Sequence, residues 1–347
     1  MECDSKLFGI SDYCIENKIL HNLTLELNTK CNLDCIHCYI PHKVSYGMST
    51  EKVLSIIDEA DALGVLNVTL TGGEIFLRDD ILDIISYIRR KYMRVFLISN
   101  GTLLDRDIIR QLRALNVAEL GISLYSTNES IHDHITRRTG SFRKTMSAIM
   151  CALTEGLRVV VKTPVMTKNI HTVREIRTFC NDHGIDAEFT CFITSKNNGD
   201  NSPRRFQITD KRGFLEFLVS TMDKQSFLKE VKPKNLESNL CKYCKNSIYI
   251  DSEGNVFPCN SFLIKIGNIF EDPLKSIWEE STILKKLQEA KYSDITGCSE
   301  CSLGSYCSFC PGFSYLEYGD YLVCSDENKM YSECRREYHN MILKGLI

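Results

Sequence analysis

The 347-residue sequence has no apolar run that approaches the roughly 20 residues needed to span a membrane. Its first residues show no basic stretch followed by an apolar core, so we find no secretory signal. The formal net charge is only -3 and no block of Lys or Arg stands out, which argues against nucleic acid as a partner. We therefore expect a cytoplasmic protein that binds neither membrane nor nucleic acid.

Cysteine, in contrast, is abundant, with 17 residues. A disulfide framework is typical of small secreted proteins with an even number of cysteines, and this chain is large with an odd number. The cysteines also gather in two places, three within residues 31–38 and nine within 241–334. Thiolates gathered in a reducing compartment bind zinc or iron–sulfur clusters. The sequence therefore predicts metal sites instead of disulfides.

Short apolar runs alternate with amphipathic segments over the first half of the chain. The expected strands are Leu23–Leu27, Val68–Leu70, Val95–Ile98, Leu120–Leu124, Val159–Val161 and Phe189–Ile193. Apolar residues recur at helical spacing between them, so the units repeat as strand and helix. Such repeats predict an α/β fold with a parallel sheet, and six units predict an open, partial (β/α)6 TIM-like barrel. Its chemistry is expected on loops at the carboxyl ends of the strands.

Composition divides the chain into four parts. Residues 1–22 precede the first strand, and residues 23–195 form the expected barrel. A polar stretch with Gly and Pro begins the third part, residues 196–240, which we expect to be a linker followed by a bridging helix. Residues 241–347 are rich in cysteine and poor in long periodic segments, so we expect a small domain held together by metal clusters.

The first cysteine group lies directly after the first strand, in the segment NTKCNLDCIHCY. Cys31, Cys35 and Cys38 place three thiolates on one short loop. A structural zinc ion or a closed cubane needs four ligands, whereas three leave one metal position open for a substrate or cosubstrate. The alternative is a zinc site in which His37 is the fourth ligand.

This spacing, followed by the aromatic Tyr39, resembles the hallmark of the radical S-adenosylmethionine (SAM) superfamily. Thr71, Gly72, Gly73 and Glu74 end the second strand and resemble the GGE motif of that family. The resemblance implies a [4Fe–4S] cluster on the three cysteines, with SAM bound at its open iron and the SAM amino group at the GGE segment. Glycines permit close backbone approach and a carboxylate can pair with an ammonium, which agrees with that role.

Further positions follow from the same resemblance. Ser99 and Asn100 end the third strand and Ser123 lies on the fourth, and these places face SAM in the family. Arg138 precedes a TGSF segment and is expected to reach the SAM carboxylate, and Tyr39 is expected to pack near adenine. An ordinary turn, a strand serine, a surface arginine and a core aromatic are the structural alternatives.

The C-terminal cysteines resemble the SPASM extension of radical SAM enzymes, which holds two auxiliary [4Fe–4S] clusters. One departure is that only two residues separate Cys307 from Cys310. The resemblance implies an inner cluster on Cys241, Cys244, Cys259 and Cys310. It implies an outer cluster on Cys298, Cys301, Cys307 and a final cysteine, for which we expect Cys334 before Cys324. A pair of structural zinc sites is the alternative.

Radical SAM chemistry implies that SAM is reductively cleaved to a 5′-deoxyadenosyl radical, which abstracts a substrate hydrogen atom, while the auxiliary clusters accept an electron. The sequence most resembles maturases of ribosomally made peptides, so a peptide substrate is expected, with a thioether or carbon–carbon cross-link or a side-chain oxidation as product. A flavodoxin- or ferredoxin-type protein is the expected electron donor. Only about twenty residues precede the first strand, so a separate protein could bind the leader of a precursor peptide.

Three other functions stay open. The first is a small-molecule SPASM dehydrogenase or an enzyme that modifies a haem precursor. The second is a peptide epimerase, in which Cys191 on the sixth strand would face the barrel interior and give a hydrogen atom to the substrate radical. The third is a non-enzymatic binding module held together by zinc.

Overall fold

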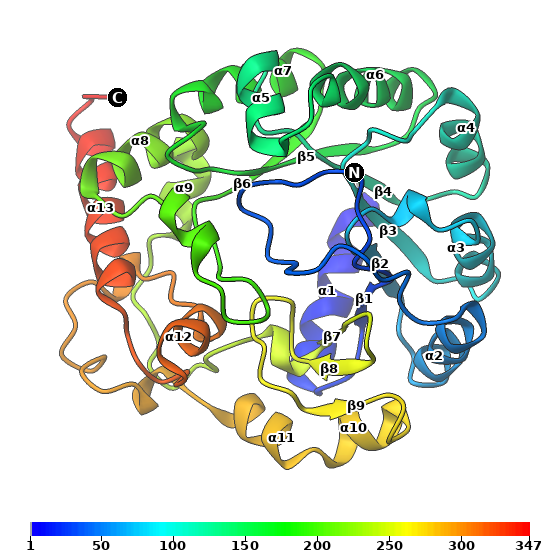
Figure 1. Ribbon diagram of the computed structural model, residues 1–347. Coiled ribbons are helices and arrows are strands. Elements are labelled where there is room, and N and C mark those ends of the chain that lie inside the picture. Colours follow the sequence, from blue (N-terminus) through cyan, green and yellow to red (C-terminus); the bar gives the residue numbers. More distant parts are fainter. Residues whose placement is uncertain (1) are drawn as a thin grey trace.

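The computed structural model describes the backbone of residues 2–347 and the side chains from residue 9 onward. It has one curved sheet with helices on its convex side (Figure 1). Its strands are β1 (Asn22–Glu26), β2 (Asn67–Thr71), β3 (Arg94–Ser99), β4 (Glu119–Ser123), β5 (Val159–Pro164), β6 (Asp186–Thr190), β7 (Ser247–Ile250), β8 (Asn255–Phe257) and β9 (Gly267–Asn268). The helices of the barrel are α2 (Thr50–Ala62), α3 (Ile81–Arg90), α4 (Arg106–Ala114), α5 (Glu129–Thr136), α6 (Ser141–Thr154) and α7 (Val173–Asp182).

The helices outside these units are α1 (Glu2–Glu16), α8 (Lys211–Thr221), α9 (Lys224–Glu230), α10 (Leu274–Glu280), α11 (Thr282–Glu289), α12 (Pro311–Tyr318) and α13 (Asp326–Leu343). Short 3-10 turns join several elements, among them η1 (Ile75–Leu77) after β2. Within the described part of the chain, no helix is both long and apolar enough to cross a membrane.

The strands follow the order β6-β5-β4-β3-β2-β1-β7-β8-β9, and the first six pair in parallel with their sequence neighbours. Each barrel strand is followed by a helix, which gives the partial, unclosed α/β barrel that the sequence predicts. All six expected strands are present, and the last begins three residues earlier than expected, at Asp186.

The sheet continues beyond β1 in a way that the sequence did not reveal. Strand β7, which follows the cysteine pair Cys241 and Cys244, pairs in parallel with β1, and β8 and β9 add antiparallel strands. The cysteine-rich region is thus attached to the barrel through the same sheet. Figure 1 shows its helices α10 to α13 completing the side of the ring that the barrel leaves open.

Strand pleating decides which residues face the barrel interior. Leu23 and Leu25 on β1 are fully buried in the core between the sheet and the outer helices. The alternate residues, Thr24 and Glu26, therefore point to the concave side, where Glu26 lies opposite Thr71 of β2. Because parallel strands end at the same edge, the loops after β1, β2, β3 and β4 meet there.

Candidate functional site

The three N-terminal cysteines lie together on the loop that follows β1. All three are partly buried, and the thiolate of Cys38 raises the pKa of both Cys31 and Cys35, although burial is the larger cause in each. Burial and the neighbouring thiolate together raise the pKa of Cys35 to about 12. Grouped, buried thiolates need a compensating positive charge, and a coordinated metal supplies it.

The chemistry of these donors fits an iron–sulfur cluster. Among the described side chains, no three His, Cys, Asp or Glu residues converge on the position of a single ion. A cubane binds each cysteine through a different iron, so its ligands lie farther apart than those of a mononuclear site. His37, the alternative zinc ligand, packs edge-on against Tyr125 with ring centroids 4.9 Å apart.

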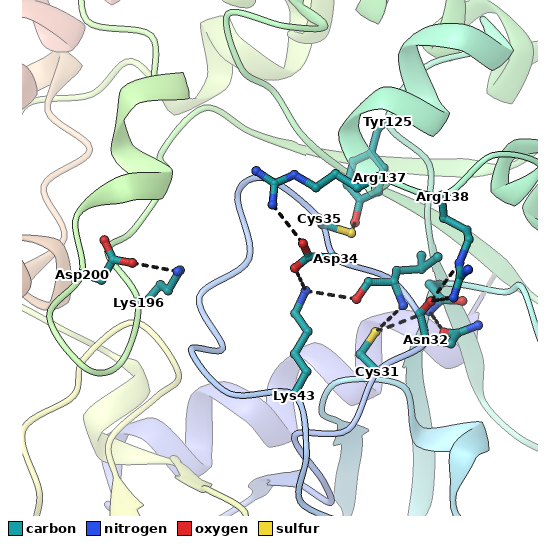
Figure 2. Close-up of polar contacts among 12 residues, drawn as sticks. Cys31, Asn32, Asp34, Cys35, Lys43, Tyr125, Arg137, Arg138, Lys196 and Asp200 are labelled. Atoms are coloured by element: carbon teal, nitrogen blue, oxygen red, sulfur yellow. Dashed lines mark hydrogen bonds and ion pairs between the residues drawn. The ribbon is translucent and has the colours of Figure 1, made fainter.

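Two cations fix the course of the loop. Lys43 donates to the Leu33 carbonyl at 3.1 Å and to the Asp34 carboxylate at 3.0 Å (Figure 2). The Arg78 guanidinium is buried and donates to the carbonyls of Leu27, Tyr46 and Met48 at 3.2, 2.6 and 2.9 Å. Arg78 therefore ties both ends of the loop to β1, and each carbonyl gains a charged donor.

The glycine segment after β2 packs directly on this loop. A Cβ on Gly73 would lie 2.3 Å from the Lys30 carbonyl oxygen, and Gly72 has a φ of +152° that side chains disfavour. The backbone N–H of Gly73 donates to the Asn28 carbonyl at 2.9 Å, and that of Glu74 donates to Lys30 at 2.8 Å. Any side chain at Gly73 would separate the two segments.

Beside Gly72, the buried Oδ1 of Asn28 has no hydrogen-bond partner among the described residues. It lies 2.5 Å from where a Gly72 Cβ would stand. A buried acceptor without a partner costs free energy, and a donor such as an ammonium would satisfy it. This atom fits the amino group of SAM.

Glu74 joins the second and third strands. Its buried carboxylate accepts from the Ser99 hydroxyl at 2.9 Å, the Asn100 N–H at 2.8 Å and the Phe76 N–H at 3.1 Å. Burial raises its pKa and these donors oppose the rise. Three donors leave room for one more on a carboxylate, so a ligand ammonium can still be accepted.

The other residues expected from the sequence surround the loop. Asn100 Nδ2 lies 3.9 Å from the Cys31 sulfur and donates to Asn32 Oδ1 at 2.9 Å. Arg138 donates to the Asn32 carbonyl at 3.2 Å (Figure 2). Ser123 lies near Tyr125, whose hydroxyl lies 3.8 Å from the Cys35 sulfur. The structure thus gathers these residues around the three cysteines.

Tyr39 and Glu26 form a pair that the sequence did not reveal. The Tyr39 hydroxyl donates to Glu26 Oε2 at 3.1 Å, and the same carboxylate accepts from Tyr249 at 2.7 Å and Ser252 at 3.1 Å. Burial raises the pKa of Glu26, with the three hydroxyls acting against the rise. The sequence offered one sign of this pair: Glu26 is the only charged residue in strand β1.

The C-terminal cysteines form two groups. In the first group, burial raises the pKa of Cys259 to about 12, and the neighbouring thiolates of Cys241 and Cys310 add to the rise. In the second group, burial raises the pKa of Cys298 and of Cys324, and the neighbouring thiolates of Cys307 and Cys301 raise both pKa values further. Each group contains four thiols.

The sequence favours Cys334 over Cys324 as the fourth cysteine of the outer group, but in the structure Cys324 is the one that lies near this group. Asn328 Nδ2 lies 3.4 Å from the Cys324 sulfur and 3.8 Å from that of Cys307, so Cys324 adjoins the outer group. Cys334 is fully buried elsewhere, with its thiol 3.7 Å from the Lys211 carbonyl. It lies on α13 within the apolar cluster that packs α8 against α13.

The interior position expected for Cys191 is wrong. This residue follows β6 and is 1% exposed, on the helix side of the sheet among Val173, Phe214 and Tyr331. Cys191 is two residues after Phe189 and therefore lies on the same, outward side of the strand. Glu188 lies on the concave side, where it pairs with Lys162. Cys191 therefore faces away from the barrel interior.

Comparison with known proteins agrees with this site. Residues 25–180 match the family model of the Radical SAM superfamily. The chain contains a radical SAM domain. Residues 241–302 match the SPASM model, described as an iron–sulfur cluster-binding domain. The first domain binds a [4Fe–4S] cluster and SAM, and the second binds auxiliary iron–sulfur clusters.

Relatives of this radical SAM protein differ in what they make. The AdoMet-dependent heme synthase of Methanosarcina barkeri is 27% identical over 326 residues, covering 86% of this chain and 93% of the relative. The antilisterial bacteriocin subtilosin biosynthesis protein AlbA of Bacillus subtilis is 28% identical over 314 residues, covering 87% and 70%. Streptococcus suis SuiB bound to precursor peptide SuiA shares the fold, with a TM-score of 0.69 at 14% identity over 90% of this chain and 76% of SuiB.

Proposed function

We propose that this radical SAM enzyme oxidatively modifies a ribosomally made peptide, forming a cross-link or oxidising a side chain. When bound, SAM and its cluster supply a 5′-deoxyadenosyl radical that removes a hydrogen atom from the substrate. The chain's own residues hold these groups. Cys31, Cys35 and Cys38 would ligate the cluster, and Asn28, Gly73 and Glu74 would accept the SAM amino group.

The oxidative part of this proposal rests on the two groups of four C-terminal cysteines. Cys241, Cys244, Cys259 and Cys310 would ligate one auxiliary cluster, and Cys298, Cys301, Cys307 and Cys324 the other. Four ligands for each cluster leave no iron open to a substrate. Full ligation therefore favours electron acceptance over direct binding of substrate to iron.

A cavity beside the cluster loop could hold part of a substrate. It has a volume of about 490 Å³ and extends from Glu26 past Asn197 to Asp251 and Phe257. Residues of the cluster loop, of the linker after β6 and of the turn between β7 and β8 line this cavity, so a substrate bound there would lie beside the cluster loop. AlbA is named for the biosynthesis of a bacteriocin and SuiB has a structure with a bound precursor peptide, and both support a peptide substrate.

Modification of a haem precursor is the second candidate, and the heme synthase relative favours it. The epimerase alternative is weakened because Cys191 lies outside the barrel interior. A separate leader-binding protein and a cytoplasmic location stay part of the proposal.

Mass spectrometry of anaerobic reactions tests the proposal. Reconstituted enzyme, SAM and reductant are incubated in parallel with short peptides encoded beside its gene and with an iron porphyrin carrying propionates. We expect a peptide to lose the mass of two hydrogen atoms, with one 5′-deoxyadenosine formed per event, and no change with the Cys31→Ala variant. Conversion of the porphyrin with every peptide unchanged would overturn the peptide proposal in favour of the haem-precursor candidate.

A further inference from the structure

Tyr125 lies two residues after the end of β4, at the edge of the barrel where the cluster loop also lies. Its hydroxyl oxygen is 3.8 Å from the Cys35 sulfur, and Figure 2 shows the hydroxyl directed at that sulfur. The motifs that predict the site from the sequence assign no role to this tyrosine. The contact therefore adds a residue to the surroundings of the cluster.

The ring and the backbone of Tyr125 are both held in place. His37 packs edge-on against the ring at a centroid distance of 4.9 Å, and the His132 ring lies at 5.3 Å. The Tyr125 N–H donates to His132 Nδ1 at 3.3 Å, and Asn169 Nδ2 donates to the Tyr125 carbonyl at 2.9 Å. A side chain fixed by packing and by hydrogen bonds of its neighbours keeps its orientation, so the hydroxyl stays beside Cys35.

The helix that holds Tyr125 also holds the thiol. The backbone N–H groups of Asp34 and Ile36, on either side of Cys35, donate to carbonyls in the last turn of α5 at 3.1 and 3.0 Å. His132, the partner of the Tyr125 backbone, belongs to the same helix. Helix α5 thus sets the position of the hydroxyl and of the sulfur relative to each other.

The contact lies at the edge of a small apolar cluster. Tyr125 is 5% exposed, and it shares this cluster, against which Cys35 packs, with Ile135, Met166, Ile193 and Phe206. A hydrogen bond in apolar surroundings is electrostatically stronger than one in water. The hydroxyl therefore acts on the sulfur with little screening.

Ligation decides which atom of the pair donates. A cysteine that ligates iron has lost its proton, so only the Tyr125 hydroxyl can donate to Cys35. Cys31 has different neighbours, because the Leu33 N–H donates to its sulfur at 3.4 Å and the Asn100 amide lies at 3.9 Å. The ligand sulfurs of one cluster would thus have side-chain donors of two kinds, an amide and a phenol.

We propose that the Tyr125 hydroxyl donates to the Cys35 sulfur and thereby raises the reduction potential of the radical SAM cluster. Reduction adds one electron, and the positive end of the O–H dipole stabilises the added negative charge. Tyr125 keeps its proton, and no bond forms or breaks. Because it acts through Cys35, Tyr125 is a positioning residue. The inference depends on the cluster and holds for a peptide and for a haem precursor alike.

A redox titration of the reconstituted holoenzyme, followed by EPR, tests this role with the Tyr125→Phe variant. Phenylalanine keeps the ring against His37 and His132 and removes only the hydroxyl. The signal that changes when SAM is added distinguishes this cluster from the auxiliary clusters. The matched control is Tyr338→Phe, which removes a buried hydroxyl that donates to the Met222 carbonyl. Iron content and SAM affinity are measured for each protein.

We expect the equilibrium constant for one-electron reduction to fall about three- to tenfold in Tyr125→Phe, where tenfold corresponds to about 59 mV. Electron–nuclear double resonance should also lose the coupling of one solvent-exchangeable proton. Tyr338→Phe should keep the wild-type potential and the coupling. An unchanged potential in Tyr125→Phe, or an equal shift in Tyr338→Phe, would overturn the proposal. So would a lower potential with every exchangeable coupling retained, since altered packing would then be the cause.

Discussion

The side-chain amide of Asn328 lies 3.4 Å from the sulfur of Cys324. The same nitrogen lies 3.8 Å from Cys307, so a residue in the first turn of α13 holds two thiols of one group. Amide donors to cluster sulfurs are among the interactions that set the properties of iron–sulfur clusters. This contact selects Cys324 over Cys334 as the fourth member of the outer group.

Replacing each of these cysteines separately should therefore have different effects. Cys324→Ala should lower the iron content of the reconstituted protein by up to about 4 atoms per chain, the content of one cubane. Cys334→Ala is the matched control and should keep full iron, because the Cys334 thiol hydrogen-bonds the Lys211 carbonyl within the apolar cluster between α8 and α13. Iron and sulfide analysis measures both. Iron loss in Cys334→Ala with retention in Cys324→Ala would restore the order expected from sequence.

Removing Arg78 should destabilise the whole cluster loop. Arg78→Met leaves the carbonyls of Leu27 and Met48 buried without their charged donor, at a cost of roughly 2–4 kcal/mol in the free energy of unfolding. Arg110→Met is the control, since Arg110 is more than half exposed and only joins Glu155 at the surface. Thermal unfolding of the reconstituted proteins compares them, and equal midpoints would contradict this role of Arg78.

A methyl group at Gly73 should weaken SAM binding. Gly73→Ala places a Cβ 2.3 Å from the Lys30 carbonyl oxygen, so the glycine segment must move away from the cluster loop. Gly9→Ala is the control, because nothing lies within 4 Å of its Cβ and alanine favours the helix. Equilibrium binding of SAM to the reconstituted proteins measures the effect. We expect at least a tenfold rise in Kd for Gly73→Ala, and an unchanged Kd would refute the close approach.

The buried Glu26 predicts a pH dependence of stability. Its pKa in the folded protein is raised above the ordinary 4.5, so the folded state holds the proton more tightly than the unfolded state. Stability contributed by this group is therefore full at low pH and decreases as pH rises from about 4.5 through the raised value.

Glu26→Gln removes this titration and keeps an oxygen that can accept from Tyr39 and Tyr249. Its thermal midpoint relative to wild type should increase as the pH rises above about 4.5. A difference in midpoint that stays constant from pH 4.5 upward would show that Glu26 does not titrate as described.

The alternation of short apolar runs with amphipathic segments predicted the barrel. Much of the site was predicted from motifs at the carboxyl ends of its strands. Val68 and Leu70 alternate with polar residues, and Gly73 and Glu74 follow them, so strand and motif were readable together. The sequence did not reveal that β7 extends the barrel sheet, because that pairing joins residues more than 220 positions apart. Chain spacing also could not decide between Cys324 and Cys334, since the contact depends on how α13 begins.

The orientation of Cys191 was mispredicted for a related reason. The expected strand Phe189–Ile193 begins three residues after the observed one, and the direction of a single side chain depends on the register of the whole strand. Arg78 and Lys43 were missed because their contacts are with backbone carbonyls, which no sequence motif specifies.

Anaerobic reconstitution with iron and sulfide analysis, followed by SAM cleavage under dithionite, tests the central assignment most directly. The chain has three groups of cysteines. If each group holds a cubane of ~4 irons, the protein should contain about 12 irons per chain and form 5′-deoxyadenosine only when reductant is present. A protein that holds zinc in place of iron, or one with about 4 irons, would contradict the assignment of two auxiliary clusters to the C-terminal cysteines.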